Sequence, residues 1–334
     1  MTLRIAINGF GRIGRMVLRA FAEQPRTGIE IVAINDLGSL DSNAHLFRYD
    51  SVHGTYRGAL MLGADSINIG HGEIKVIAHP DPLNLPWKDM NINVVLECSG
   101  RFTKREEAAK HLTAGAKRVL VSAPADGADL TVVYGVNHNA INGTHTVLSN
   151  ASCTTNCLAP VAYVLNKTVG IESGFMTTIH SYTGDQRLVD TIHSDLHRAR
   201  AAATSMIPSS TGAAKAVGLV LPELKGRLDG TAIRVPTPNV SVVDFKFIAK
   251  KNTTIAEIND ALTVAATDGA LKGILGVSTV PLVSIDFNHD PRSSIADLKQ
   301  THVVDGKLVR VLAWYDNEWG FSNRMLDVAS HLAI

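Results

Sequence analysis

Apolar residues in the first 150 positions gather in short runs that alternate with segments of helical spacing. The runs Leu3–Asn8 and Ile29–Ile34 predict strands, and the spacing of Val17, Leu18 and Phe21 predicts a helix between them. The same reasoning predicts strands at 74–77, 94–98, 118–122, 131–134 and 146–149, and helices at 104–114 and in a segment ending near residue 51. This alternation is typical of a doubly wound α/β domain with a mostly parallel sheet.

The pattern changes after residue 150, where strand-like runs dominate. Strands are predicted at 175–180, 231–235, 240–248, 295–301 and 308–314, with helices at 211–220, at 255–267 and in a segment that begins after residue 152 and includes the apolar run 158–165. This order indicates an α+β domain with a largely antiparallel sheet. The final segment, 317–334, has the apolar spacing of a helix. We therefore expect two domains, 1–150 and 151–316, with the C-terminal helix 317–334 packing back onto the first.

A glycine-rich turn joins the first predicted strand to the first predicted helix. Gly9-Phe10-Gly11-Arg12-Ile13-Gly14 has the spacing G-x-G-x-x-G in the context that makes this motif informative. Gly9 permits the tight turn, Gly11 lets a pyrophosphate approach the backbone, and Gly14 lets the helix pack on the strand. Asp36, after the second strand, can bind the ribose hydroxyls and repel a 2′-phosphate. Together these features favour a Rossmann-type domain that binds NAD over a plain strand-to-helix turn.

The stretch Asn150–Cys157 places a thiol, hydroxyls and amides just before an apolar helical run. Ser152 is predicted to cap that helix, which places Cys153 in the first turn. There the helix dipole and unpaired N–H groups are expected to lower the pKa of the thiol and favour the nucleophilic thiolate. His180, at the end of the strand 175–180, is a candidate base for Cys153. Cys157 is interpreted as a packed residue, and an inert Cys153 is the alternative that the dinucleotide fingerprint weakens.

Two further segments have the composition of anion sites. Ser209–Gly212 precedes a helical run, so hydroxyls and free backbone N–H groups gather at a helix start. Arg198, Arg200 and Arg234 can offer the forked donors that bind phosphate. Arg234, flanked by apolar residues, is the strongest candidate, and Arg200 is the one best explained as a solvated surface charge.

Composition excludes several classes of protein. With 334 residues, 45% hydrophobic and 19% charged, the chain is typical of a globular protein of about two domains. The net charge of +1 offers no general attraction for nucleic acid or membranes. Three cysteines form neither a disulfide framework nor a zinc ligand set, so no metal site is expected. We expect a cytoplasmic protein because neither a signal peptide nor a run of membrane-spanning length is apparent.

These motifs together resemble the phosphorylating glyceraldehyde-3-phosphate dehydrogenase family over essentially the whole chain. The resemblance runs from Ile7–Arg15 through the octapeptide Asn150–Cys157 to Trp314–Gly320. It implies that Cys153 is the nucleophile and His180 its activating base. It assigns the substrate and phosphate site to Ser152, Thr154, Thr183, Arg198, Thr211, Gly212 and Arg234. It assigns cofactor contacts to Arg12, Ile13, Asp36, Ser122 and Asn317, beside the three glycines of the turn.

The family resemblance also implies the reaction. Glyceraldehyde 3-phosphate is oxidised with NAD and inorganic phosphate to 1,3-bisphosphoglycerate through a thioester on Cys153, in glycolysis or gluconeogenesis, by a homotetramer. Two departures concern the cofactor: Thr191-Ile192 stands where NAD-specific members often carry Leu-Pro, and Pro80 where many carry arginine. Asp36 still favours NAD. Erythrose-4-phosphate dehydrogenase activity and a non-catalytic binding role on the same scaffold are the alternatives.

Overall fold

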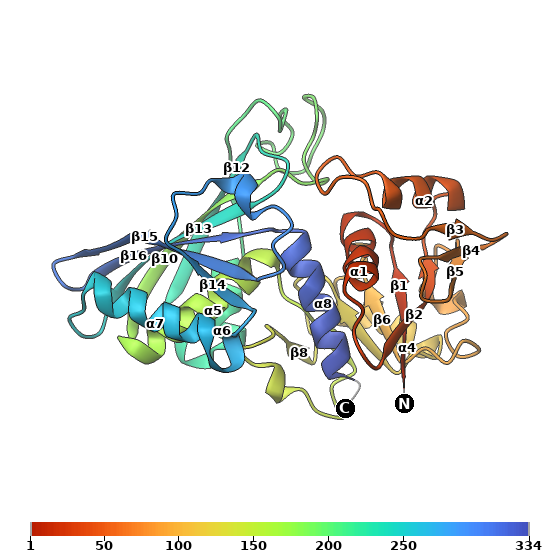
Figure 1. Cartoon of the computed structure of the whole chain (residues 1–334), viewed down its shortest axis with the longest axis horizontal. Coiled ribbons are helices and arrows are strands. Elements are labelled where there is room, and N and C mark those ends of the chain that lie inside the picture. Colours follow the sequence, from red (N-terminus) through yellow and green to blue (C-terminus); the bar gives the residue numbers. More distant parts are fainter. Residues whose placement is uncertain (1, 333–334) are drawn as a thin grey trace. The chain divides into compact units, whose positions relative to one another are not determined.

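The computed structural model describes residues 2–332 and shows two compact units (Figure 1). The first unit comprises the residues up to Ser152 together with those from Ser322 onward. The second unit comprises Cys153–Phe321. Each unit contains one sheet.

The first unit holds nine strands, their connecting helices and most of the C-terminal helix. Its elements are β1 (Leu3–Asn8), α1 (Arg12–Glu23), β2 (Ile29–Asn35), α2 (Leu40–Arg48), β3 (Met61–Leu62), β4 (Ser66–Asn68), β5 (Glu73–Ile77), the 3-10 helix η1 (Pro82–Asn84), β6 (Val94–Glu97), α3 (Arg105–Ala108), α4 (Lys110–Thr113), β7 (Arg118–Val121), β8 (Leu130–Thr131), η2 (His138–Ala140) and β9 (Val147–Ser149).

The first sheet has the strand order β3-β4-β5-β2-β1-β6-β7-β9-β8. Every neighbouring pair from β5 to β8 is parallel, whereas β3, β4 and β5 pair antiparallel at one edge. The register pairs Asn8 with Asn35 on one side and with Glu97 on the other. Three polar residues therefore lie next to one another where three adjacent parallel strands end.

The core of this unit explains why its strands are apolar runs. All four residues of β6 are buried, as expected for a parallel strand covered on both faces. Trp87 is fully buried in a cluster with Ala6, Ala33 and Val95. The sheet can therefore be rigid up to the strand ends, where ligands bind in doubly wound folds.

Two predicted elements of the first unit are wrong in extent. The helix expected at 104–114 is two short helices, α3 and α4, that meet at Ala109. The strand expected at 131–134 ends at Thr131. There the side chain of Asn137 takes over the backbone partners, because its Oδ1 accepts from the N–H of Val133 and its Nδ2 donates to the carbonyl of Thr131.

The second unit contains seven strands and three long helices. Its elements are α5 (Cys153–Thr168), β10 (Ile171–Ser181), β11 (Ile207–Ser210), α6 (Ala213–Val220), η3 (Pro222–Leu224), β12 (Leu228–Val235), β13 (Ser241–Ala249), α7 (Ile255–Thr267), η4 (Gly269–Leu271), β14 (Leu275–Ser278), η5 (Ser284–Phe287), β15 (Ser294–Val304) and β16 (Leu308–Tyr315).

The second sheet has the order β11-β12-β10-β13-β16-β15-β14. Its pairs are antiparallel except β10 with β12 and β14 with β15. Helices α5, α6 and α7 lie together along one face, where α5 contacts β10, β13, β15 and β16 (Figure 1). The predicted fold class, a doubly wound parallel sheet followed by a largely antiparallel α+β unit, is confirmed.

The last helix, α8 (Trp319–His331), was predicted at 317–334, of which 333–334 lie outside the described residues. Its start is fixed by Asp316, whose Oδ1 accepts from the N–H groups of Glu318 at 2.9 Å and Trp319 at 2.7 Å. A carboxylate at this place satisfies two donors that the first helical turn leaves unpaired.

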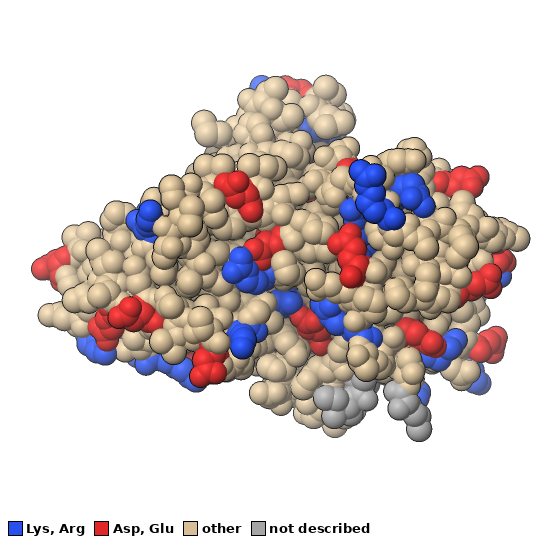
Figure 2. Space-filling view, viewed as in Figure 1, with Lys and Arg blue, Asp and Glu red and all other residues tan. Residues whose placement is uncertain are grey.

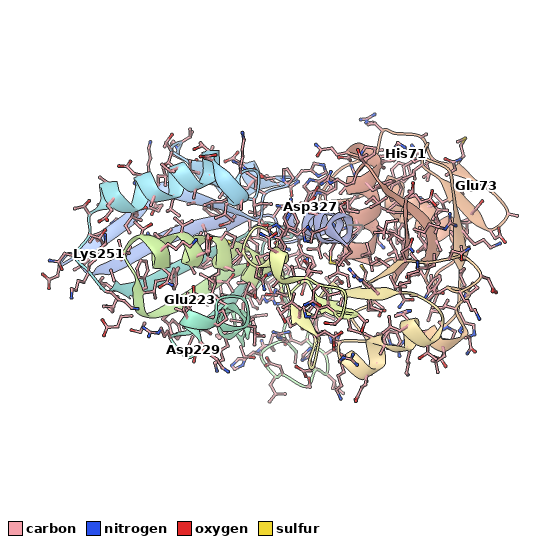
Figure 3. All side chains as sticks on the ribbon, turned by 90° about the horizontal axis from the view of Figure 1, so that it is seen from below. His71, Glu73, Glu223, Asp229, Lys251 and Asp327 are labelled. Carbon is pink, nitrogen blue, oxygen red and sulfur yellow. The ribbon has the colours of Figure 1, made fainter. Side chains whose placement is uncertain are left out.

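Charged side chains of both signs are interspersed over the face shown in Figure 2, in keeping with a net charge of +1. Figure 3 labels three charged residues of the second unit, Glu223, Asp229 and Lys251, all of which are exposed. Within residues 2–332, no helix has the length and apolar character that crossing a membrane requires.

Candidate active site

The glycine turn of the first unit has the geometry that its spacing predicts. Gly9 has a φ of 89°, and a Cβ atom there would lie 2.5 Å from backbone atoms of Ser99. A Cβ atom at Gly14 would lie 2.1 Å from the carbonyl oxygen of Gly9, so only glycine allows this helix-to-strand approach. A Cβ atom at Gly11 would have no heavy atom within 4 Å. The backbone at Gly11 is therefore open to a ligand.

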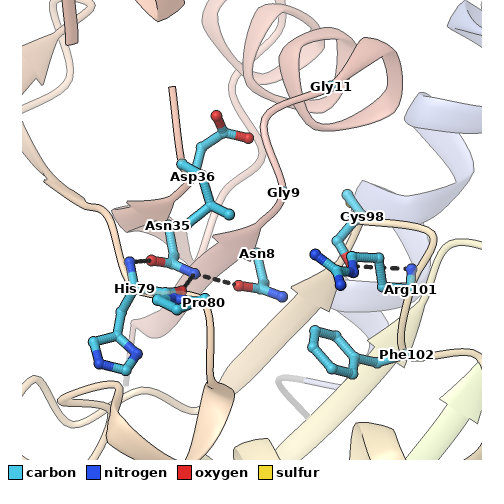
Figure 4. A pocket seen from close by; sticks show the side chains of 12 residues that line it. Asn8, Gly9, Gly11, Asn35, Asp36, His79, Pro80, Cys98, Arg101 and Phe102 are labelled. Atoms are coloured by element: carbon cyan, nitrogen blue, oxygen red, sulfur yellow. Dashed lines mark hydrogen bonds between the residues drawn. The ribbon is translucent and has the colours of Figure 1, made fainter. Parts of the chain in front are cut away.

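Asp36 lies beside this turn at the edge of a cavity of about 270 Å³. Its Oδ2 accepts from the N–H of Phe10 at 2.7 Å, and its Oδ1 accepts from the N–H of Gly38 at 2.8 Å. The cavity is lined by residues at the ends of β1, β2 and β6 and by two loops (Figure 4): Asn8, Gly9, Gly11, Asn35, Asp36, Leu37, His79, Pro80, Cys98, Ser99, Arg101 and Phe102. The cavity thus lies at the carboxyl edge of the sheet.

The other cofactor candidates of the first unit, Arg12, Ile13 and Ser122, have a less direct relation to this cavity. Arg12 and Ile13 open α1, and the guanidinium of Arg12 pairs with the buried carboxylate of Asp50. Burial works to raise the pKa of Asp50, but hydrogen bonds from Arg12 and from two backbone N–H groups outweigh it and lower the pKa to about 2. Ser122 follows β7 and is absent from the described lining of the cavity, whereas Cys98, the residue after β6, contributes to that lining.

In the second unit, the structure brings the two predicted catalytic residues together. Cys153 is the first residue of α5, and His180 is the penultimate residue of β10. The Sγ atom of Cys153 lies 3.6 Å from Nε2 of His180, which is hydrogen-bond distance for sulfur. His180 is buried, and its ring packs edge to face on Tyr315. The pair can therefore pass a proton between thiol and imidazole.

The expected lowering of the thiol pKa at the helix start is wrong for this structure. Burial of the sulfur raises the pKa of the Cys153 thiol, and the positive charge of Arg234 only partly offsets that effect. Burial and the charge of Arg234 also lower the pKa of His180 to about 3. In the protein alone, the pair is consequently a neutral thiol beside a neutral imidazole.

Arg234 is the strongest electrostatic influence on this pair. It lies opposite His180 in the parallel register of β10 and β12. Its Nη1 is 2.6 Å from Nδ1 of His180 and donates to the carbonyl of Ser181 at 3.0 Å. The Nε atom of Arg234 is buried and has no hydrogen-bond partner among the described residues. A buried guanidinium with an unused donor is suited to an anionic ligand.

Arg198 is already held by the protein. It donates from Nε and Nη2 to Oγ of Ser209, at 2.9 and 2.6 Å, and it pairs with Asp185. Its positive charge contributes to the low pKa of His180, which places it within electrostatic range of the catalytic pair. Ser209 belongs to strand β11, directly before the helix start at Gly212.

Three threonines, a glycine and a serine complete the predicted substrate residues. Gly212 is the N-terminal cap of α6, and Oγ1 of Thr211 accepts from the N–H of Ala213 at 3.2 Å. The hydroxyl of Thr154 is buried against the hydroxyl of Tyr315 at 2.8 Å, so its backbone rather than its side chain is available to a ligand. Thr183 lies in the loop after β10, and Ser152 immediately precedes α5.

Asn317, the cofactor candidate of the second unit, has its amide oxygen occupied. Oδ1 accepts from the hydroxyls of Ser181 and Ser241, each at 2.9 Å. Since Ser241 also accepts from the N–H of Ser181, its own proton is directed to Asn317. This arrangement leaves the NH₂ group of Asn317 as the part that can bind a ligand.

Sequence reasoning missed several of these supporting residues. Tyr315, Ser241 and Glu97 each carry a buried polar group in contact with a candidate site residue or with the lining of the cavity. The available signal was a polar side chain inside or at the end of an apolar strand run. The three cysteines are free, and the described residues contain no group of three histidine, cysteine or acidic side chains that could hold a metal ion.

Comparison with known proteins adds independent information. The model of the family described as glyceraldehyde 3-phosphate dehydrogenase, NAD binding domain, matches residues 3–105. The model described as glyceraldehyde 3-phosphate dehydrogenase, C-terminal domain, matches residues 152–317. The two matches cover the glycine turn and Asp36 in the first case, and Cys153, His180 and Arg234 in the second.

Relatives of similar length are highly identical to this chain. A glyceraldehyde-3-phosphate dehydrogenase of Xanthobacter flavus is 67% identical over 98% of both chains. One of Cereibacter sphaeroides is 64% identical over 98% of both chains. One of Geobacillus stearothermophilus is 54% identical over 100% of this chain and 99% of its own.

Proposed function

The chain belongs to the glyceraldehyde-3-phosphate dehydrogenase family, and we propose that it oxidises glyceraldehyde 3-phosphate with NAD and inorganic phosphate to 1,3-bisphosphoglycerate. The observation that carries this proposal is the Cys153–His180 pair, with Sγ and Nε2 3.6 Å apart beside a buried guanidinium. A nucleophile, a base and a cation for an anionic substrate are the groups that this reaction requires.

The cavity of the first unit fits NAD. The open backbone at Gly11 accepts a pyrophosphate, and the carboxylate of Asp36 is oriented by the N–H groups of Phe10 and Gly38. When bound, NAD supplies the hydride acceptor. We propose Gly9, Gly11, Arg12, Ile13, Gly14, Asp36 and Ser122 as its contacts in this unit, and the NH₂ group of Asn317 as a donor to it.

Cys153 and His180 perform the covalent chemistry in this proposal. His180 takes the thiol proton at Nε2 as the sulfur adds to the aldehyde carbon, and it passes that proton to the aldehyde oxygen to complete the hemithioacetal. It then takes the hydroxyl proton of the hemithioacetal as hydride leaves the same carbon for NAD. The product is a thioester on Cys153. Inorganic phosphate attacks that thioester, the carbon–sulfur bond breaks as the acyl phosphate forms, and the proton held by His180 returns to the sulfur, which restores the thiol of Cys153.

Binding of anions follows from the charges around the pair. We propose Arg234, Arg198, Thr183, Thr211 and Gly212 as donors for the substrate phosphate and the attacking phosphate, with the backbone of Ser152 and Thr154 near the reacting carbon. Both arginines lower the pKa of His180 in the protein alone. A bound dianion offsets these charges, so the imidazole becomes a better proton acceptor when substrate or phosphate is present.

We propose a homotetramer in the cytoplasm, with 1–150 as the cofactor domain and 151–316 as the catalytic domain. Four apolar side chains of the second unit, Leu188, Ile192, Leu196 and Met206, are 76–91% exposed. A cluster of exposed apolar side chains in one segment supports a surface covered by another subunit. Sedimentation should give about four times the chain mass of 35.7 kDa.

The test follows absorbance of reduced nicotinamide with purified protein, NAD and glyceraldehyde 3-phosphate. With phosphate we expect sustained turnover, and without it a burst of about one turnover per Cys153 because the thioester is not released. Cys153→Ser should abolish both, and Cys157→Ser, a packed cysteine on the same helix, should retain turnover. Faster turnover of erythrose 4-phosphate would instead favour the related dehydrogenase, and no reaction with either sugar phosphate would contradict an enzymatic role.

A further inference from the structure

A buried carboxylate lies beneath the cavity of the first unit. Glu97 ends β6 and is 1% exposed. Its Oε1 accepts from the N–H of Ser99 at 2.8 Å and from Oγ of Ser99 at 2.5 Å. Its Oε2 accepts from Nδ2 of Asn8 at 2.5 Å and lies 2.9 Å from Nε2 of His111. Four protein donors thus surround one carboxylate.

The donor role of His111 is fixed by its other neighbour. Nε1 of Trp87 lies 2.9 Å from Nδ1 of His111, and an indole N–H can only donate. Nδ1 must therefore be an acceptor, which leaves the proton of the neutral ring on Nε2, facing Glu97. The side chain of Glu97 consequently acts only as an acceptor of hydrogen bonds, from Asn8, Ser99 and His111.

From Glu97 a chain of side-chain amides runs along the carboxyl edge of the sheet. Nδ2 of Asn8 faces Glu97, so Oδ1 of Asn8 faces the next strand and accepts from Nδ2 of Asn35 at 2.7 Å. Asn35 also donates to the carbonyl of His79 at 2.9 Å and accepts from its N–H at 2.9 Å (Figure 4). The amide chain links β6, β1 and β2 to the loop that carries His79 and Pro80.

The order of donors and acceptors in this chain has one origin. An amide can present either its oxygen or its NH₂ group, whereas a carboxylate only accepts. Glu97 forces the NH₂ group of Asn8 toward itself, and that choice forces the orientation of Asn35 and the pairing with His79. Asn8, Asn35, His79 and Ser99, whose positions these hydrogen bonds fix, all line the cavity.

We propose that Glu97 is a positioning residue for NAD: its buried carboxylate sets the direction of the hydrogen bonds along the amide chain and thereby holds the lining residues Asn8, Asn35 and Ser99 in the geometry that binds NAD. This role rests on the proposed binding of NAD in that cavity. Glu97 itself does not line the cavity, so it acts through Asn8, Ser99 and the loop at His79.

The decisive variant is Glu97→Gln, which keeps the size of the side chain and removes its charge. An amide there cannot accept from Asn8, His111 and both donors of Ser99 at once, so at least one buried donor loses its acceptor and the orientation of Asn8 is no longer determined. Calorimetry should show about tenfold weaker binding of NAD and of ADP-ribose, since one hydrogen bond to a charge is lost.

The matched control is Glu30→Gln. Glu30 belongs to β2 of the same sheet and pairs with Arg4, but it is partly exposed and lies toward the amino end of its strand. Binding of NAD to this variant should stay within about twofold of the native value because surface ion pairs contribute little. Alkylation of Cys153 by iodoacetamide should be unchanged in both variants, which separates an effect on the cavity from general unfolding.

A second pair of variants tests the direction of the hydrogen bonds along the amide chain. Asn8→Asp alone places two carboxylates side by side and should weaken binding of NAD at least tenfold. In the double variant Asn8→Asp with Glu97→Gln, the carboxylate stands at position 8 and no longer at position 97. There it can still accept the hydrogen bond from Asn35. Binding should recover to within about threefold of the native value, although the bond from His111 is lost.

The outcomes are distinct. If Glu97→Gln binds NAD as tightly as the native chain, the positioning role is overturned. If Glu97→Gln does not fold, the double variant decides, because one that folds yet binds no better than Asn8→Asp also overturns the proposal. If the native chain binds neither NAD nor ADP-ribose, the proposed cofactor site fails instead.

Discussion

The two units each contain one buried charge next to a candidate site, but they treat it in opposite ways. In the first unit the carboxylate of Glu97 is surrounded by four donors of the protein. In the second unit Arg234 forms no ion pair with any carboxylate among the described residues, and its buried Nε has no partner. The charge of Glu97 is satisfied by donors of the protein itself, whereas the charge of Arg234 requires a ligand of opposite sign.

This difference predicts what each unit contributes to the reaction. A fully satisfied network is rigid, so the cofactor cavity is formed before NAD arrives and variants there should change affinity. An unpaired cation beside a neutral base is a site completed by substrate, so variants there should change rate and pH dependence.

The largest effect is expected for His180→Gln. Without an imidazole, neither the thiol nor the hemithioacetal has a proton acceptor, and kcat should fall about a thousandfold. Stopped-flow absorbance of reduced nicotinamide measures the burst that reports this step. His197→Gln is the control, since His197 belongs to the same unit and its side chain is 68% exposed. A burst rate within tenfold of the native one would exclude His180 as the base.

Much of the fold could be predicted from the sequence because it depends on local patterns. Gly9, Gly11 and Gly14 with the flanking apolar runs predicted the strand, turn and helix of the nucleotide unit, and the family models agree. The short edge strands β3 and β4 were missed because two or three residues carry no periodicity. The strand after Thr131 was overpredicted because a side-chain amide, Asn137, replaces the ladder there.

The site was predictable to a smaller degree. Cys153 and His180 were paired from residue type and position, and the structure brings their side chains together. The thiol pKa was predicted in the wrong direction because the helix dipole can be inferred from sequence, whereas burial of the sulfur depends on tertiary packing. The amide chain from Glu97 was invisible for the same reason, since its members are far apart in sequence and meet only through strand register.

The second effect in size is expected for Arg234→Met. Loss of charge-assisted hydrogen bonds to phosphate should raise the KM for phosphate about a hundredfold. Burial remains, but the positive charge that lowers the pKa of His180 is gone, so that pKa rises and the acid limb of the rate profile moves to higher pH. Initial rates between pH 3 and 9 measure both changes.

The matched control is Arg200→Met. Arg200 is an exposed arginine of the same unit that pairs with Asp190. Its loss should leave the acid limb in place and change the KM for phosphate less than about threefold. An acid limb that does not move in Arg234→Met would contradict the electrostatic coupling of Arg234 to His180.

The smallest effect concerns the first unit and its ion pair between Arg12 and Asp50. The folded pKa of Asp50 is about 2, below the ordinary value of 3.8, so the ionised side chain stabilises the folded state above pH 4. That contribution disappears as the pH falls from about 4 to 2. Asp50→Asn should lower the free energy of unfolding by about 1–2 kcal/mol at pH 7, where Arg12 is partly screened by solvent, and by nearly nothing at pH 2.

Urea titrations at several pH values measure this difference, with the exposed Asp89→Asn as the control that should show no such dependence. Asp50→Asn also tests whether the charged groups of the first unit are satisfied without bound NAD. If the guanidinium of Arg12 serves only to pair with Asp50, removing that carboxylate should not increase the affinity for NAD. The affinity should stay unchanged, or fall because the start of α1 is less ordered. Tighter binding of NAD by Asp50→Asn would show that Arg12 is withheld from the cofactor, and the contrast between a self-sufficient first unit and a ligand-completed second unit would fail at this residue.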